Sequence, residues 1–348
     1  MPLRLVSLSR IPRIFRLSFL ILLFEKLATL DIIYAIISKH IPGILLELYL
    51  SNTIVLIITT FTISYLKYVY SPKILKWLKT VRIMEKEAKK DEFVSKLKKA
   101  FSFCFGFKPI FVAVVIYFVR FFIITFYLER NIIMSLIYSY NLYSLFINDF
   151  LTIIMIQLSI WYLFFLNAAT HYVAKIPIKV DTITDYYEAY GKLTNQLTQL
   201  TVLFGLNIGY YSGAIIRWAT LTHHYFWLTF FMTLIVFGVM LFFTLGFSGV
   251  YKGLKASKDL KLKEIEGRIK ILKSMYPVLF SSPTDNSFHA LESIPPNVIL
   301  FSEKLERELF LHMQIDERRL IGISNIANLI ISIMVSISTS YIQLFLSI

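Results

Sequence analysis

Seven polar side chains recur near the carboxyl end of the chain, in a segment that is otherwise apolar. Each follows the previous one after three or four residues, an average step of about 3.7, which matches the ~3.6 residues per turn of an α-helix. The spacing predicts one polar stripe along a single helix. Its members are Asn325, Asn328, Ser332, Ser336, Thr339, Gln343 and Ser347.

Amide and hydroxyl groups are disfavoured against lipid tails, so such a stripe faces either water or another helix. Several copies around an axis would line a neutral aqueous channel, whose narrowest point could close by apolar dewetting. Alternatively, the stripe is a packing seam, because serine and threonine also join membrane helices. The spacing leaves both interpretations open.

The composition places this helix in a membrane protein. Of 348 residues, 57% are hydrophobic, 16% aromatic and only 17% charged, and the mean hydropathy is +0.66. Soluble proteins are usually about 25% charged. The single cysteine, Cys104, excludes an intrachain disulfide. We expect an all-α, polytopic membrane protein with little structure on the extracellular side.

Crossing about 30 Å of hydrocarbon takes roughly 20 apolar residues, and this window predicts seven transmembrane helices. The first is the weakest because Glu25, Lys26 and Asp31 interrupt it, and we interpret it as an uncleaved span. The windows are residues 17–37, 44–66, 109–128, 145–168, 199–217, 225–250 and 320–346.

The distribution of basic residues predicts the orientation. Thirty of the 36 lysines and arginines lie in the alternate segments 1–16, 67–100, 171–198 and 251–319. Such segments stay cytoplasmic, so the amino terminus is expected inside and the carboxyl terminus outside. This is the reverse of a G-protein-coupled receptor. The net charge of +14 follows from topology and needs no nucleic-acid partner.

Three parts are expected along the chain. Residues 1–250 form a six-helix region with a ligand pocket and cytoplasmic loops 67–100 and 171–198. The loop 67–100 is either helical against the membrane face or a solvated charged loop. Residues 251–319 form a cytoplasmic anchor of two helices joined by a loose loop, and residues 320–348 form the seventh, pore-lining helix.

Enzymatic and metal-binding motifs are absent. There is no phosphate-binding glycine loop, no His-Glu-x-x-His and no Gly-x-Ser-x-Gly, so we expect neither an enzyme nor a cofactor. His223 and His224 have no further residues nearby that would complete a metal site. A transporter is a weaker alternative, because internal repeats and paired broken helices are missing.

The expected outer ends of the spans are rich in aromatic residues. These could form a ligand pocket, since rings offer apolar faces with polar edges, or an interfacial belt. Asp149 lies inside the fourth span, where a carboxylate should face protein or water, and Arg120 could be its counter-charge. The predicted ligand-binding residues are Asp149, Asn148, Arg120, Tyr127, Tyr210, Tyr211, Trp218 and Trp227.

Residues 340–348 resemble a signature of the insect gustatory receptors, in which Thr-Tyr, five hydrophobic residues and Gln-Phe follow one another. Ser340 replaces the threonine, Tyr341 matches, and Ser347 and Ile348 stand where Gln-Phe would. Residues 308–314, 190–193 and 203–205 also look like this family, as does the layout of seven spans.

The resemblance implies a chemosensory receptor in the plasma membrane of sensory neurons. It would be a tastant-gated, non-selective cation channel of four subunits, homomeric or heteromeric, held together by the cytoplasmic segments and surrounded by lipid. The seventh span would line the pore, and Ser347 and Ile348 would occupy the gate. A G-protein-coupled chemoreceptor is the main alternative.

Overall fold

The structure is a computed structural model that describes residues 13–38, 43–82, 87–127, 144–221, 225–280, 294–315 and 323–345. These residues are almost entirely helical and form no strand, which confirms the all-α class. The elements are α1 (Arg13–Ala28), α2 (Leu30–Ile37), α3 (Gly43–Tyr65), the π-turn η2 (Leu66–Tyr70), α4 (Ser71–Thr80), α5 (Glu87–Cys104), α6 (Phe107–Tyr127), α8 (Ser144–Ala174), α9 (Ile183–Leu221), α10 (Tyr225–Met275), the 3₁₀ turn η3 (Pro277–Phe280), α12 (Pro296–Met313) and α13 (Ile323–Phe345).

Each predicted span overlaps a helix, and within the described residues four helical stretches are long and apolar enough to cross a membrane. They are Tyr49–Thr80, Lys90–Val119, Phe146–Ala174 and Met232–Met275, which correspond to the second, third, fourth and sixth predicted spans. The first predicted span is divided into α1 and α2. Helix α13 contains a shorter apolar stretch, Leu329–Ser338.

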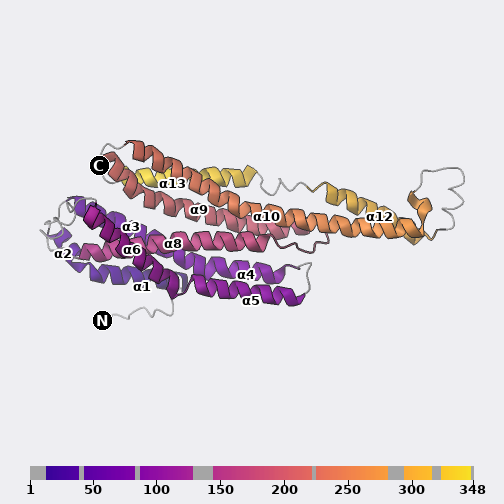
Figure 1. Ribbon diagram of the computed structural model, residues 1–348, viewed down its shortest axis with the longest axis horizontal. Coiled ribbons are helices and arrows are strands. Elements are labelled where there is room, and N and C mark those ends of the chain that lie inside the picture. The colour runs from indigo at the N-terminus through magenta and orange to yellow at the C-terminus, as the bar shows by residue number, and fades with distance from the viewer. Residues whose placement is uncertain are drawn as a thin grey trace, which may run out of the picture.

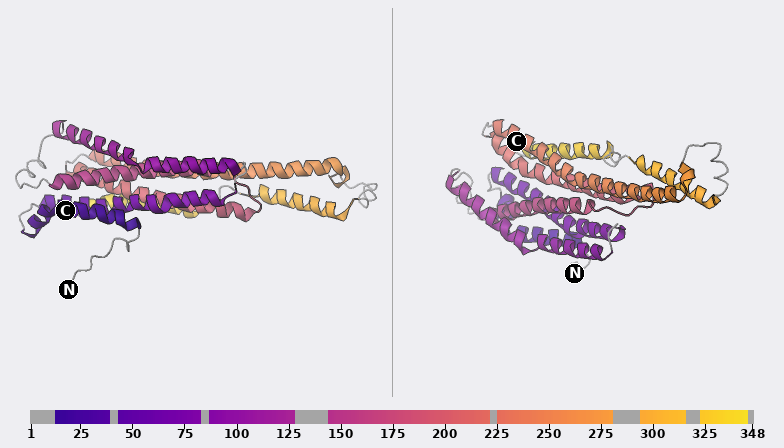
Figure 2. Two further views of the ribbon diagram at one scale, coloured as in Figure 1. Left: turned by 90° about the horizontal axis from the view of Figure 1, so that it is seen from below. Right: turned by 45° about the vertical axis from the view of Figure 1, so that its right-hand side comes forward.

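The helices form one elongated bundle (Figure 1). Helix α10 has 51 residues and is about 76 Å long at 1.5 Å per residue, far more than a bilayer's hydrocarbon requires. Its second half therefore continues beyond the bundle, where α12 lies alongside it (Figures 1 and 2). Helix α13 lies against α9 and α10 at the opposite end of the molecule.

The segment 67–100 is helical where it is described. Helix α4 continues α3 through the π-turn, and α5 leads into α6. Ile74, Leu78, Val94 and Leu97 are buried in the main hydrophobic core. These helices therefore bury their apolar side against the bundle, whereas the prediction placed them against the membrane face or read the segment as a solvated loop.

Glycines allow unusually close approach of α10 to α8. A Cβ atom added at Gly253 would lie 1.7 Å from the carbonyl oxygen of Ala174, and one added at Gly249 would lie 2.5 Å from that of His171. Gly246, one turn earlier, faces the side chain of Asn167 on α8, whose amide donates to the carbonyl oxygen of Phe242 at 2.8 Å. Small residues at these positions fix the contact between the two helices.

Candidate functional site

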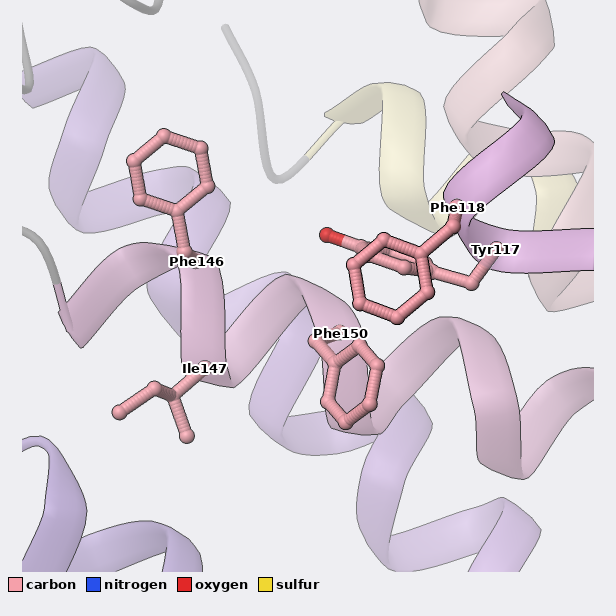
Figure 3. Close-up of a pocket in the computed structure, with 5 residues that line it drawn as sticks. All are labelled: Tyr117, Phe118, Phe146, Ile147 and Phe150. Atoms are coloured by element: carbon pink, nitrogen blue, oxygen red, sulfur yellow. The ribbon is translucent and has the colours of Figure 1, made fainter. Parts of the chain in front are cut away.

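Among the described residues, an open hollow lined mainly by aromatic side chains lies between α6 and α8. We call it the aromatic groove; its volume is about 330 Å³. The stick view in Figure 3 shows its five lining residues, Tyr117 and Phe118 from α6 and Phe146, Ile147 and Phe150 from α8. Tyr117 and Phe150 meet edge to face, with ring centroids 4.8 Å apart. The groove can therefore hold an apolar or aromatic molecule by ring contacts.

Asp149 precedes the groove residue Phe150 on α8 but does not itself line the groove. Its side chain is half-buried, and the hydroxyl of Tyr117 donates to its Oδ2 at 3.5 Å. Tyr117 thus presents a ring to the groove and a hydroxyl to the carboxylate. The lining of the groove is almost entirely apolar, so the groove suits contacts with rings and aliphatic groups more than hydrogen bonds.

Asn148, the residue before Asp149, has a structural contact instead. Its side chain is 0% exposed, and its amide donates to Oε1 of Glu25 on α1 at 2.7 Å. Successive residues on a helix point about 100° apart, so Asn148 faces α1 while Asp149 faces α6. The prediction grouped the two as ligand-binding residues, but neither Asn148 nor Asp149 lines the groove.

Of the three charges that interrupt the first predicted span, Glu25 and Lys26 form an ion pair, whereas Asp31 is exposed. Nζ of Lys26 lies 3.0 Å from Oε2 of Glu25 and donates to the hydroxyls of Tyr49 and Thr53 on α3, both at 2.8 Å. Asp31 accepts a hydrogen bond from the hydroxyl of Ser144, at the start of α8. Pairing of this kind lowers the cost of ionised groups at membrane depth.

The other predicted ligand-binding residues do not build the groove in the described part of the chain. Tyr210 is half-buried on α9 and is not a lining residue. The side chains of Arg120, Tyr127, Tyr211, Trp218 and Trp227 lie outside the described residues.

The groove residues themselves escaped sequence reasoning, which examined only the ends of the spans. A local signal existed, because Phe146 and Phe150 are four residues apart and flank Asp149. Residues at this spacing share one face of a helix.

Helix α13 packs on α9 through small residues. A Cβ atom added at Gly205 would lie 2.7 Å from the carbonyl oxygen of Ser332 and 2.8 Å from Oγ of Ser336. Both serines are 0% exposed, and the hydroxyl of Ser336 donates to the carbonyl oxygen of Ser332 at 2.7 Å. We call this contact the α9–α13 seam. Within a single chain, Ser332 and Ser336 therefore pack against another helix and do not line a water-filled surface.

The remaining stripe residues cannot be placed in the same way. The side chains of Asn325, Asn328, Thr339 and Gln343 lie outside the described residues, as does Ser347. Of the family signature, Ser340 and Tyr341 belong to α13 without described side chains, and Ile348 lies outside the described part.

The opposite side of α13 is uncovered and apolar. Ile330 is 52% exposed and Met334 is 62% exposed, and Ile326 and Ile331 are about half exposed. We call these four residues the open face of α13. In a membrane such a face is covered by lipid or by another helix.

Among the described residues, no group of three or more histidine, cysteine, aspartate or glutamate side chains could hold a metal ion. His223 and His224 lie outside them. No protein-family model matches this sequence, and neither a curated protein nor a solved structure matches it. The part of the chain that the structure describes is therefore helical, with four helices long and apolar enough to cross a membrane and an aromatic groove.

Proposed function

We propose that this chain is a subunit of a ligand-gated cation channel that crosses the plasma membrane seven times and acts as a chemosensory receptor. The ligand is a small, largely apolar tastant bound in the aromatic groove. The observation that carries the proposal is the position of α13: one side of this helix packs on α9 of the same chain, and the open face on the other side is uncovered.

The open face suits the centre of an oligomer. If four copies surround an axis, their open faces meet there and form an apolar constriction. Water leaves a narrow apolar pore, so a ring of these side chains blocks ions. In this proposal, Ser332 and Ser336 stay packed in the α9–α13 seam while the channel is closed.

A ligand opens such a channel only if it binds the open arrangement more tightly than the closed one. The groove is suited to this because it lies between α6 and α8, and α8 also packs on α9 and α10, the two helices that carry α13. A molecule that separates α6 from α8 therefore acts on the helices next to α13.

Cysteine accessibility tests the position of the open face. The only native cysteine, Cys104, is buried, so background labelling is low. The variant Ile330→Cys places a thiol on the open face, and Ser332→Cys, two residues away, is its matched control in the α9–α13 seam. Applied before the tastant, a charged methanethiosulfonate reagent should reduce the current that the tastant evokes afterwards in Ile330→Cys and should leave the current of Ser332→Cys unaffected. Equal insensitivity of both variants would mean that lipid covers the open face.

The groove has its own matched pair on α6. Phe118 and Phe111 are both 58% exposed, but only Phe118 lines the groove. Loss of one ring contact, at about 0.5–1.5 kcal/mol, should raise the half-maximal tastant concentration about two- to tenfold in Phe118→Ala. Phe111→Ala should respond as the unmodified chain does. An equal loss in both variants would remove the groove as the ligand site.

A further inference from the structure

A second buried polar cluster lies far from the groove, where α9, α10 and α12 meet. His312, at the end of α12, is 2% exposed and faces the ring of Tyr186 on α9, with centroids 5.6 Å apart. Tyr186 is itself fully buried. Neither the tyrosine hydroxyl nor Nδ1 of His312 has a hydrogen-bond partner. Two unpartnered polar groups thus meet in an interface that is otherwise closed to water.

Charged groups on α10 and α12 surround this contact. Nζ of Lys261 lies 3.2 Å from Oε1 of Glu308 and 3.9 Å from Oε2 of Glu264. Nε2 of His312 lies 4.0 Å from the same Oε1 of Glu308. Lys261 is buried, so its ammonium already occupies the carboxylate that a protonated imidazole would need.

The end of α12 is also held by a second lysine. Nζ of Lys258 on α10 donates to the carbonyl oxygen of Ile315 at 2.8 Å. Helix α12 ends at Met313 and α13 begins at Ile323, so the cluster lies just before the connection to α13. Asp316, Glu317, Arg318 and Arg319 in that connection lie outside the described residues.

We propose that His312 is a proton-sensitive clamp, which holds α12 on α9 and α10 while the imidazole is neutral and releases it on protonation. An imidazolium would be enclosed with Lys261 and would share Glu308 with it. The clamp therefore opens when the solution around the second half of α10 and α12 becomes acidic. The basic residues of segment 251–319 predict that this solution is the cytoplasm. This inference goes beyond the ligand-gated function and does not depend on it.

The direction of titration agrees with this geometry. Burial lowers the pKa of His312 below its usual 6.5, Glu308 partly opposes this and Lys261 adds to it. A histidine whose pKa is depressed in the packed state stabilises packing above about pH 6.5, and this stabilisation is lost as the pH falls. Release should therefore begin in the mildly acidic range.

Hydrogen–deuterium exchange on the purified full-length protein tests the clamp without requiring channel activity. Protection factors, corrected for the intrinsic effect of pH, should be measured on peptides from α12 at about pH 7.5 and about pH 5.5. If His312 has its ordinary pKa of 6.5 once α12 is released and stays neutral while α12 is packed, protonation can shift the packing equilibrium by at most about tenfold over this pH interval. We expect a loss of severalfold, confined to α12 and its contacts.

Four variants separate the clamp from a purely structural role. His312→Gln should abolish the pH dependence, whereas His171→Gln, at the end of α8, should leave it unchanged. Lys261→Met should reduce the pH dependence, because the pKa of His312 rises when the neighbouring cation is removed. Glu308→Gln should increase it, because the imidazolium loses its carboxylate. An unchanged pH response in His312→Gln, or shifts of the same sign in the Lys261 and Glu308 variants, would overturn the proposal.

Discussion

The α9–α13 seam makes a quantitative prediction about Gly205. In Gly205→Ala the new Cβ atom would lie 2.7 Å from the carbonyl oxygen of Ser332, against an ordinary contact of 3.4 Å or more. Helix α13 must therefore move away by about 0.7 Å, since a backbone carbonyl cannot rotate aside as a side chain can. Overpacking of this kind costs about 1–3 kcal/mol.

The same substitution also has a favourable effect, because alanine is a better helix former than glycine by about 0.8–1.0 kcal/mol. Gly191 on the same helix isolates this effect, since a Cβ atom added there meets nothing within 4 Å. Gly191→Ala should therefore stabilise the protein slightly. The difference in unfolding free energy between the two variants should equal the overpacking cost, about 1–3 kcal/mol.

Both variants can be compared by fluorescence-detected thermal unfolding of the detergent-purified protein, with chemical denaturation as a second measurement. We expect Gly191→Ala to match or exceed the parent protein and Gly205→Ala to melt below Gly191→Ala. Equal stabilisation of the two variants would show that α13 does not contact α9 at this position, and the closed-channel interpretation of the seam would be withdrawn.

Three further predictions concern other helix contacts. Gly253→Ala should be more damaging than Gly205→Ala, because its Cβ would lie 1.7 Å from the carbonyl oxygen of Ala174; the same thermal measurement should show the lower melting temperature. Asn148→Ala should cost about 1–3 kcal/mol by leaving the buried carboxylate of Glu25 without its amide donor, and prior replacement of Glu25 by glutamine should reduce that cost in a double-mutant cycle. Asp185 accepts hydrogen bonds from two backbone amides at the start of α9, and these bonds lower the pKa of its carboxyl group. The carboxylate therefore stabilises the helix start at neutral pH, and this stabilisation is lost as the pH falls through the lowered pKa. Hydrogen exchange at the helix start should show this loss in the parent protein and not in Asp185→Asn.

The existence of the helices was predictable, because it depends on runs of similar residues. The apolar windows identified the segments that became α3, α6, α8 and α10. Helix boundaries were less predictable: α10 continues far past the sixth predicted span without a proline or glycine pair to stop it. A hydropathy window reports the length of an apolar run and does not report where a helix ends in water.

Contacts between helices were not predictable from single windows. Asn148 and Asp149 are neighbours in sequence, yet one bonds Glu25 on α1 and the other contacts Tyr117 on α6. The direction of each side chain depends on which helices surround α8, and that follows from the packing of the whole bundle. The polar stripe of α13 was visible in the sequence, but the partner of Ser332 and Ser336 became apparent only with Gly205 opposite them.

The unbroken course of α10 has a mechanical consequence. Beyond the close contact with α8 at Gly253, α10 continues for 22 residues to Met275, about 33 Å at 1.5 Å per residue. Each degree of tilt about that contact moves Met275 by about 0.6 Å, so a tilt of about 5° moves the far end by about 3 Å. A small rearrangement where α8 meets α10 is thus amplified with distance along the helix.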